Sequence, residues 1–324
     1  MTRRWAMPSL IVLVGILFVL SIIVGRVTLG WNVWSMQDAV SRVILIELRL
    51  PRAILGVLVG ASLGIAGAAM QGYLRNALAE PGTLGVSAMS ALGAVLSIFF
   101  NIAGLHPWVL PICGVLGGMT AMTALFVLSG ATASVLTLVL SGIILSALAI
   151  AGISLALSLS PSPWAATEIV RWMLGGLTDR SFDELTIAAP LIIVGCIAVL
   201  GCRRALDALT LGETGARSLG IDLNRAQWQL AIGIGLIVGG STAVTGVIGF
   251  VGLIVPHLMR PLVGSRPGAL LIPSAIAGAA LVLAGDILVR LLPGGSELEL
   301  GVVMSLIGAP FFFVLLHSMR RKLS

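Results

Sequence analysis

The residue that most suggests chemistry in this sequence is a carboxylate inside an apolar run, Asp286 within residues 268–292. A charge inside a bilayer is costly, so it marks a functional site by default. Arg290 follows four residues later, on the same face of a helix, so a local ion pair is one interpretation. The alternative is a proton-coupled secondary transporter that uses Asp286 with support from Glu80. Such carriers usually show several intramembrane charges and a repeated hydropathy pattern, and the sequence shows neither clearly.

The other residue types that carry chemistry lack a matching motif. The chain contains no HExxH, CxxC or P-loop sequence, and its single lysine is Lys322, near the C-terminus. Cys113, Cys196 and Cys202 lie in or beside apolar runs without metal-ligand spacing. His257 is a lone histidine, which is more typical of a structural residue than of a ligand. We therefore expect no enzymatic activity, and no metal or cofactor bound by this chain.

Composition indicates which elements must position these residues. Of the 324 residues, 58% are hydrophobic and 10% are charged, and the mean hydropathy is +1.12. Water-soluble domains have about 25% charged residues. Because about 20 apolar residues cross a bilayer as a helix, the chain has room for roughly ten spans and no large soluble domain. We expect one all-α, polytopic membrane domain over residues 1–324, and attribute the net charge of +6 to topology rather than to nucleic acid.

Apolar runs bounded by charge, proline or glycine indicate nine clear spans, and a short further run at 249–256 follows the seventh. Basic residues at both chain ends are expected in the cytoplasm, which requires an even number of spans, so we expect about ten. The clear spans are expected near residues 8–29, 53–72, 84–100, 108–128, 133–159, 186–200, 228–248, 268–292 and 300–317. This topology leaves many arginines outside, namely Arg26, Arg42, Arg49, Arg52, Arg171, Arg180 and Arg290.

Three stretches are not plain spans. Residues 30–51 form an external connection, whose amphipathic part from Met36 to Ile46 we expect along the membrane surface. Residues 164–176 are predicted to contain a short external helix. Residues 203–222 form the longest cytoplasmic segment, which glycines break into one or two short amphipathic helices. This segment would either lie on lipid or dock in a groove of a soluble partner.

Small residues recur on one face of the second span. Gly56, Gly60 and Gly64 are spaced four residues apart. Small residues at this spacing let helix backbones approach closely, so we expect tight helix packing there rather than a binding site.

Four blocks of the sequence resemble the iron-siderophore, cobalamin and haem permeases of bacterial ABC importers, the transmembrane subunits of type II importers. The first block runs from Arg49-Leu50-Pro51-Arg52 to Met70-Gln71, Arg75-Asn76-Ala77-Leu78-Ala79-Glu80-Pro81-Gly82 and Leu84-Gly85-Val86. The second is Leu211-Gly212-Glu213 with Ala216-Arg217 and Leu219-Gly220, and the third runs from Gly246 through Gly249, Pro256 and His257 to Arg260. The fourth runs from Glu297 to Gly301 and on to Gly308-Ala309-Pro310-Phe311-Phe312. Their order and spacing cover residues 49–312.

The resemblance implies a ten-span subunit that forms a homodimer, or a heterodimer with a sister permease, around a central pathway. It implies two cytoplasmic ABC ATPase subunits, which bind ATP and Mg, and a periplasmic or lipid-anchored substrate-binding protein that docks outside. The chain would then be a multi-pass protein of the bacterial cytoplasmic (inner) membrane, surrounded by lipid. It would translocate a ferric siderophore, or haem or cobalamin. The pathway wall would come mainly from spans five, eight and ten and from the external helix near residues 169–174.

The resemblance also assigns roles to single residues. Arg49, Arg52 and Arg290 fall where such permeases present arginines to acidic residues of the binding protein, in charge-assisted pairs. Coupling to the ATPase is assigned to Leu211, Gly212, Glu213, Ala216, Arg217, Leu219 and Gly220. A structural role within the motifs is assigned to Gln71, Asn76, Pro81, Gly249, Pro256, His257, Gly308 and Pro310.

The sequence departs from the family pattern in two loops. Glu297-Leu298-Glu299 stands where Glu-Leu-Pro is common, and Asn76-Ala77-Leu78-Ala79 stands where Asn-Pro-Leu-Ala is usual. Both departures affect local loop rigidity and leave the overall assignment unchanged. Gate residues near Ser134 do not match the pattern well enough to be assigned.

Overall fold

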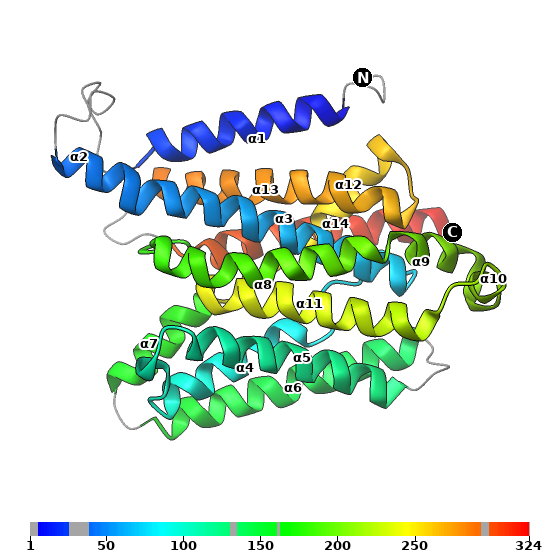
Figure 1. The fold of residues 1–324 in the computed structure, drawn as a ribbon, viewed down its shortest axis with the longest axis horizontal. Coiled ribbons are helices and arrows are strands. Elements are labelled where there is room, and N and C mark those ends of the chain that lie inside the picture. Colours follow the sequence, from blue (N-terminus) through cyan, green and yellow to red (C-terminus); the bar gives the residue numbers. More distant parts are fainter. Residues whose placement is uncertain (1–5, 26–38, 130–134, 161–162, 293–297, 324) are drawn as a thin grey trace.

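Helices are the only regular secondary structure in the described part of the chain. A computed structural model describes residues 6–25, 39–129, 135–160, 163–292 and 298–323, and within these ranges no β-strand is present (Figure 1). Ser134 and Glu297 lie outside them. The expected all-α class is therefore confirmed.

Seven helices are long and apolar enough to cross a membrane, and three shorter helices are also apolar. The long helices are α1 (Ala6–Ile23), α3 (Leu50–Tyr73), α5 (Val109–Ser129), α6 (Val135–Ser158), α8 (Phe182–Gly201), α11 (Leu223–Thr245) and α13 (Pro267–Leu291). The shorter ones are α4 (Val86–Phe99), α12 (Val251–Val263) and α14 (Leu300–Leu323). They correspond one by one to the expected spans, about ten in number.

Short helical elements connect these spans. They are α2 (Ala39–Val43), the π-helix η2 (Ile44–Arg49), the 3₁₀-helices η3 (Ala103–Leu105) and η4 (Leu209–Leu211), α7 (Pro163–Leu174), α9 (Arg203–Ala208) and α10 (Gly212–Ser218). The expected external helix at 164–176 is thus present as α7. Glu168 and Arg171 stand three residues apart on one side of α7, which leaves the other side apolar.

The segment before the second span differs from the expectation. Helices α2, η2 and α3 follow one another without a break and form one apolar run, Val40–Tyr73. Pro51 lies where the π-helix η2 passes into α3, and the chain stays helical across it. The described part of the stretch from Met36 to Ile46 therefore extends α3 as one helix, and its expected place along the membrane surface stays a prediction. Residues 30–38 of the expected segment lie outside the described ranges.

The two ends of the helix bundle differ. Helices α9 and α10 lie at the same end as the start of α1 and the end of α14, whereas α2 and α7 lie at the opposite end (Figure 1). We call the first end cytoplasmic, following the arginine distribution in the sequence, and the second end external. The start of α1 and the end of α14 lie at the same end of the bundle, which agrees with an even number of crossings.

The most extensive helix pair is α3 with α13. A Cβ atom at Gly60 would overlap the backbone of Gly278, and one at Gly64 would overlap the carbonyl of Ser274. The absence of side chains therefore lets the two backbones touch, which gains dispersion contacts along both helices. The tight packing predicted from the glycine spacing is confirmed, and its partner is α13.

We expect Gly60→Val to destabilise the protein by about 3 kcal/mol, because the new side chain forces α3 and α13 apart. This value is the upper end of the usual cost of inserting extra atoms into a well-packed core. Gly15→Val on α1 is the matched control, since a Cβ atom at Gly15 has no neighbour within 4 Å. Thermal unfolding in detergent should show a lower melting temperature for the first variant only. Equal melting temperatures would contradict the close contact.

Candidate functional site

The cytoplasmic segment 203–222 folds as α9, η4 and α10. Gly212 and Gly220 have φ values of +84° and +77°, a left-handed conformation that favours glycine, and they bound α10 on its two sides. Leu209 and Ala216 are buried and form a small cluster that Tyr73 of α3 joins. The segment is thus held to the end of α3 by its own apolar residues.

Two leucines of this segment face away from the chain. The side chains of Leu211 and Leu219 are 67% and 61% exposed. They lie at an open groove lined by Arg204, Asp207, Ala208, Thr210, Leu211, Leu219, Ile221 and Arg266. Glu213 and Arg217 are also exposed, on α10. Of the seven predicted coupling residues, Ala216 is the one buried inside the chain, so it supports the segment rather than reaching outward.

The three predicted docking arginines gather at the external end, around Asp286. Arg52 bonds to Oδ1 of Asp286 through Nε at 2.9 Å and Nη2 at 2.8 Å, and Arg290 pairs with Oδ2. Asp286 is fully buried. Arg290 also donates to the carbonyl of Ser21 at 2.7 Å, and Arg49 donates to that of Ile23 at 2.6 Å. The end of α1 is therefore tied to α3 and α13 by arginines.

This geometry bears on two expectations: the outward orientation of the docking arginines and the role of Asp286. Arg49 and Arg290 are buried rather than turned outward, because their guanidinium groups satisfy the last carbonyls of α1, which have no partner within that helix. Arg52 is 11% exposed. The deep charge Asp286 has two arginine partners, so the ion-pair interpretation is confirmed. No carrier function is needed to explain the charge, and a role of these arginines in docking stays a prediction.

The first and third sequence blocks meet at the short helix α12. Nε2 of Gln71 donates to the carbonyl of Gly252 at 3.1 Å, while its Oε1 accepts from Nη2 of Arg260 at 2.7 Å. The carboxylate of Glu80 accepts hydrogen bonds from the backbone N–H groups of Phe250 and Leu253 at the start of α12. An acid at a helix N-terminus satisfies free donors and opposes the positive end of the helix dipole.

The remaining motif residues surround the same helix or its connections. A Cβ atom at Gly308 would overlap the ring of Phe250, and His257 makes an edge contact with Phe311, the ring centroids being 5.9 Å apart. Oδ1 of Asn76 accepts from the N–H of Leu78 at 3.0 Å and stabilises its loop. Pro81 and Pro256 are buried, Gly249 is half-buried, and Pro310 is exposed on α14. Most of the motif residues thus build the surroundings of α12.

A polar depression lies at the external end beside α7. Arg171 lies 3.7 Å from Asp179 and 3.8 Å from Glu299, the acid that replaces the usual proline. Burial lowers the pKa of Arg180, which lines the same depression. Ile169 of α7 is fully buried against α4 and α6 rather than exposed at a pathway wall.

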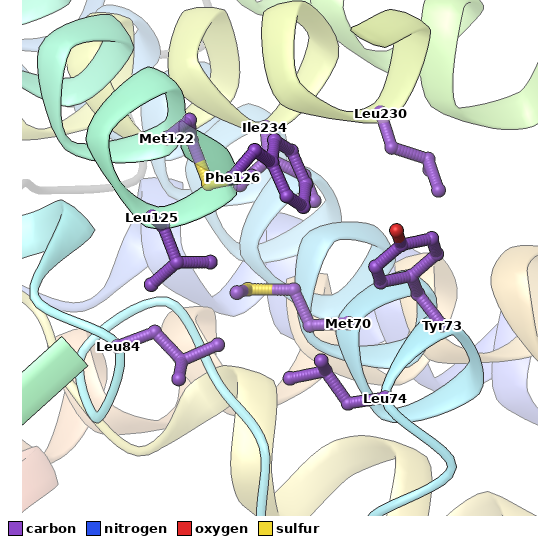
Figure 2. A pocket seen from close by; sticks show the side chains of 9 residues that line it. All are labelled: Met70, Tyr73, Leu74, Leu84, Met122, Leu125, Phe126, Leu230 and Ile234. Carbon is purple, nitrogen blue, oxygen red and sulfur yellow. The ribbon is translucent and has the colours of Figure 1, made fainter. Parts of the chain in front are cut away.

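A small apolar pocket lies between α3, α5 and α11 (Figure 2). Its lining residues are Met70, Tyr73, Leu74, Leu84, Met122, Leu125, Phe126, Leu230 and Ile234. Its volume of about 10 Å³ would hold at most one water molecule. The pocket is therefore a packing gap.

Comparison with known proteins fits the motifs and the fold. The model of the FecCD transport family matches residues 12–318. The chain belongs to the FecCD transport family. The vitamin B12 import system permease protein BtuC of Vibrio cholerae is 36% identical, with 97% of this chain and 95% of BtuC covered. The Fe(3+) dicitrate transport system permease protein FecD of Escherichia coli is 37% identical, with 86% of each chain covered.

A solved structure has the same fold. It is an inward-facing ABC transporter assigned to the metal-chelate type, with a TM-score of 0.86, 32% identity and 96% of this FecCD chain and 98% of that chain covered. The resemblance drawn from the four blocks is confirmed. This FecCD protein is a multi-pass permease of the bacterial cytoplasmic membrane, a transport subunit of ABC importers.

Two contacts of this FecCD protein could not be found from its motifs. Asp207 of α9 bonds to the backbone of Gly268 in α13, and Glu80 bonds to the start of α12. Both acids bind backbone groups, and the sequence does not show which backbone a distant acid will meet. The only signal in the sequence for either contact was the position of an acid, Glu80, directly before Pro81.

Proposed function

We propose that this chain is the membrane-spanning subunit of an ATP-driven importer that moves a metal chelate into the cytoplasm. The observation that carries the proposal is the pair of exposed leucines, Leu211 and Leu219, on segment 203–222 at the cytoplasmic end. Large apolar side chains on a charged, water-facing surface favour burial by a protein partner. In this family that partner is an ABC ATPase subunit. ATP and Mg bind there, not on this chain.

The assembly contains two permease copies, or this chain with a sister permease, and two ATPase subunits. ATP binding draws the ATPases together, displaces segment 203–222 and alternates access to a pathway between the permeases. Helices α6, α12 and α14 form the pathway wall, together with the exposed residues of α7. A largely uncharged wall suits bulky chelates, which must bind weakly enough to leave.

A substrate-binding protein docks at the external end near Arg49, Arg52 and Arg290. Arg52 is the arginine of this cluster that reaches the surface. A carboxylate of the binding protein placed there would share Arg52 with Asp286 in a charge-assisted pair. Docking would then alter the ion pairs that hold the end of α1.

The proposed substrate is a ferric siderophore, with haem and cobalamin as the other members of the class. The relative FecD is named for a ferric chelate and the relative BtuC for vitamin B12, at nearly equal identity. Both are bulky chelates in which the ligand shell hides the charge of the metal. The substrate class follows from what these relatives share.

Uptake into proteoliposomes tests this function. The permease would be reconstituted with its ATPase and binding protein, and loaded separately with a ferric siderophore, haem or cobalamin. We expect accumulation of one of them only with ATP and Mg, unchanged by a protonophore. Asp286→Asn should keep the same dependence on ATP. Uptake without ATP, driven by a proton gradient and abolished by Asp286→Asn, would replace the proposal with a secondary carrier.

A further inference from the structure

Segment 203–222 is fastened to the first turn of α13 by two side chains of α9. The N–H of Gly268 donates to Oδ1 of Asp207 at 2.8 Å, and Nε of Arg203 donates to the carbonyl of Gly268 at 3.1 Å. Nη2 of Arg266 adds an ion pair to Asp207 at 3.3 Å. The first N–H groups of a helix have no partner within it, and an acid there also opposes the helix dipole. Asp207 is therefore the cap of a helix that lies 61 residues further along the chain.

Packing prevents α9 from sliding on this contact. A Cβ atom at Gly268 would lie 2.8 Å from the carbonyl oxygen of Arg203, so the two backbones touch. Next to it, Pro267 of α13 lies against Gly72 at the end of α3, and the buried Leu206 fills the same corner. The start of α13 and the end of α3 thus hold α9 from two directions.

The α3–α13 pair extends from this contact to the external end. Gly60 and Gly278 bring the two backbones together in the middle of the pair, and Arg52 of α3 bonds to Asp286 of α13 near the external end. Close backbone packing and a buried ion pair make two helices move together. A displacement of α9 would therefore reach the arginine cluster through this pair.

We propose that Asp207 and Arg203 are positioning residues that join segment 203–222 to α13, so that displacement of the segment by ATP moves α3 and α13 as one body. This inference rests on the proposed function as an ATP-driven permease. It predicts that the joint is needed for coupling, not for binding of the ATPase. Asp207 also lines the groove, but its carboxylate is bonded to Gly268 and Arg266, whereas the side chains of Leu211 and Leu219 are exposed to the partner.

The first test compares three variants in the complete reconstituted transporter. Asp207→Ala should bind the ATPase and hydrolyse ATP as the native chain does. It should move about tenfold fewer substrate molecules per ATP, a typical size for coupling between sites. Asp207→Asn should restore most of the ratio, because its amide oxygen still accepts from Gly268. Ser181→Ala is the matched control, since Ser181 caps its own helix, α8, and lies outside segment 203–222.

The second test measures distance in the complete transporter. Spin labels on Thr210 of η4 and Ser265 before α13, with the native cysteines replaced, report whether the two elements move together. We expect the same distance with and without ATP when Asp207 is present, and a broader distribution with Asp207→Ala. A distance that changes with ATP in the presence of Asp207 would overturn the inference, even if Asp207→Ala failed to fold.

Failure of this inference and failure of the proposed function would give different experimental results. If the native complex transports with ATP and Asp207→Ala keeps the native ratio of substrate to ATP, the joint is not needed and this inference is wrong. If the native chain transports with no ATPase, the proposed function itself is wrong.

Discussion

Replacing Asp286 with leucine is expected to lower the stability of the protein more than any other single change at the external end. The substitution leaves two arginines of the interior, Arg52 and Arg290, without their carboxylate. Breaking a buried ion pair on one side typically costs about 3–5 kcal/mol, because the remaining charge loses its compensation. Thermal unfolding in detergent should show a large loss. The end of α1 should become sensitive to protease, since Arg290 also holds that end.

Two further variants make this prediction specific. Asp179→Asn removes an exposed charge at the same end, paired only at 3.7 Å, and should cost at most about 0.5 kcal/mol, because asparagine tolerates the φ of +56° at this position. The double variant Asp286→Leu with Arg290→Leu should recover part of the loss, because it removes one of the uncompensated charges. An Asp286→Leu protein as stable as the native chain would show that the cluster is not a buried ion-pair network.

Changing Leu211 and Leu219 to aspartate is expected to abolish binding of the ATPase. Each leucine is more than half exposed, and burial of one such side chain in a partner is worth about 1.5–3 kcal/mol. Loss of both therefore weakens the complex by a hundredfold or more, before the cost of burying a charge is counted. Affinity of the purified ATPase for the permease in nanodiscs measures the effect.

The control variant changes a similarly exposed leucine at the external end of the bundle. Leu105 is 76% exposed in η3, at the external end, so Leu105→Asp should leave ATPase affinity unchanged. Folding of each variant should be native, because neither Leu211 nor Leu219 belongs to the packed core. If the ATPase bound the double variant as tightly as the native chain, segment 203–222 would not be its contact.

Apolar length was enough to predict most of the spans. Helices α5, α6, α11 and α13 begin and end within a few residues of the expected limits, because charge, proline or glycine bounds their apolar runs. The stretch before α3 was expected as a separate amphipathic connection, and its pattern gave no sign that its helix continues into the second span. Its helix nevertheless continues into α3, with Arg49 satisfied by carbonyls of α1.

The candidate site was predictable in position but not in orientation. The glycines around α10 and the exposed Leu211 follow from local sequence, because positive φ angles and short helices depend on neighbours along the chain. Whether Arg290 faces outward or inward depends on α1, more than 260 residues away. The caps made by Asp207 and Glu80 depend in the same way on distant backbones. One-dimensional patterns contain no information about these pairings.

Co-purification of the native complex tests the central claim most directly. The tagged chain would be extracted from its own host's membranes in mild detergent, and its stable partners identified by mass spectrometry and assayed for ATP hydrolysis. We predict recovery of a P-loop ATPase in equal amount to the permease, with hydrolysis that needs Mg, and its loss with Glu213→Arg. A well-folded, monodisperse permease that carries no ATPase in either form would contradict the account.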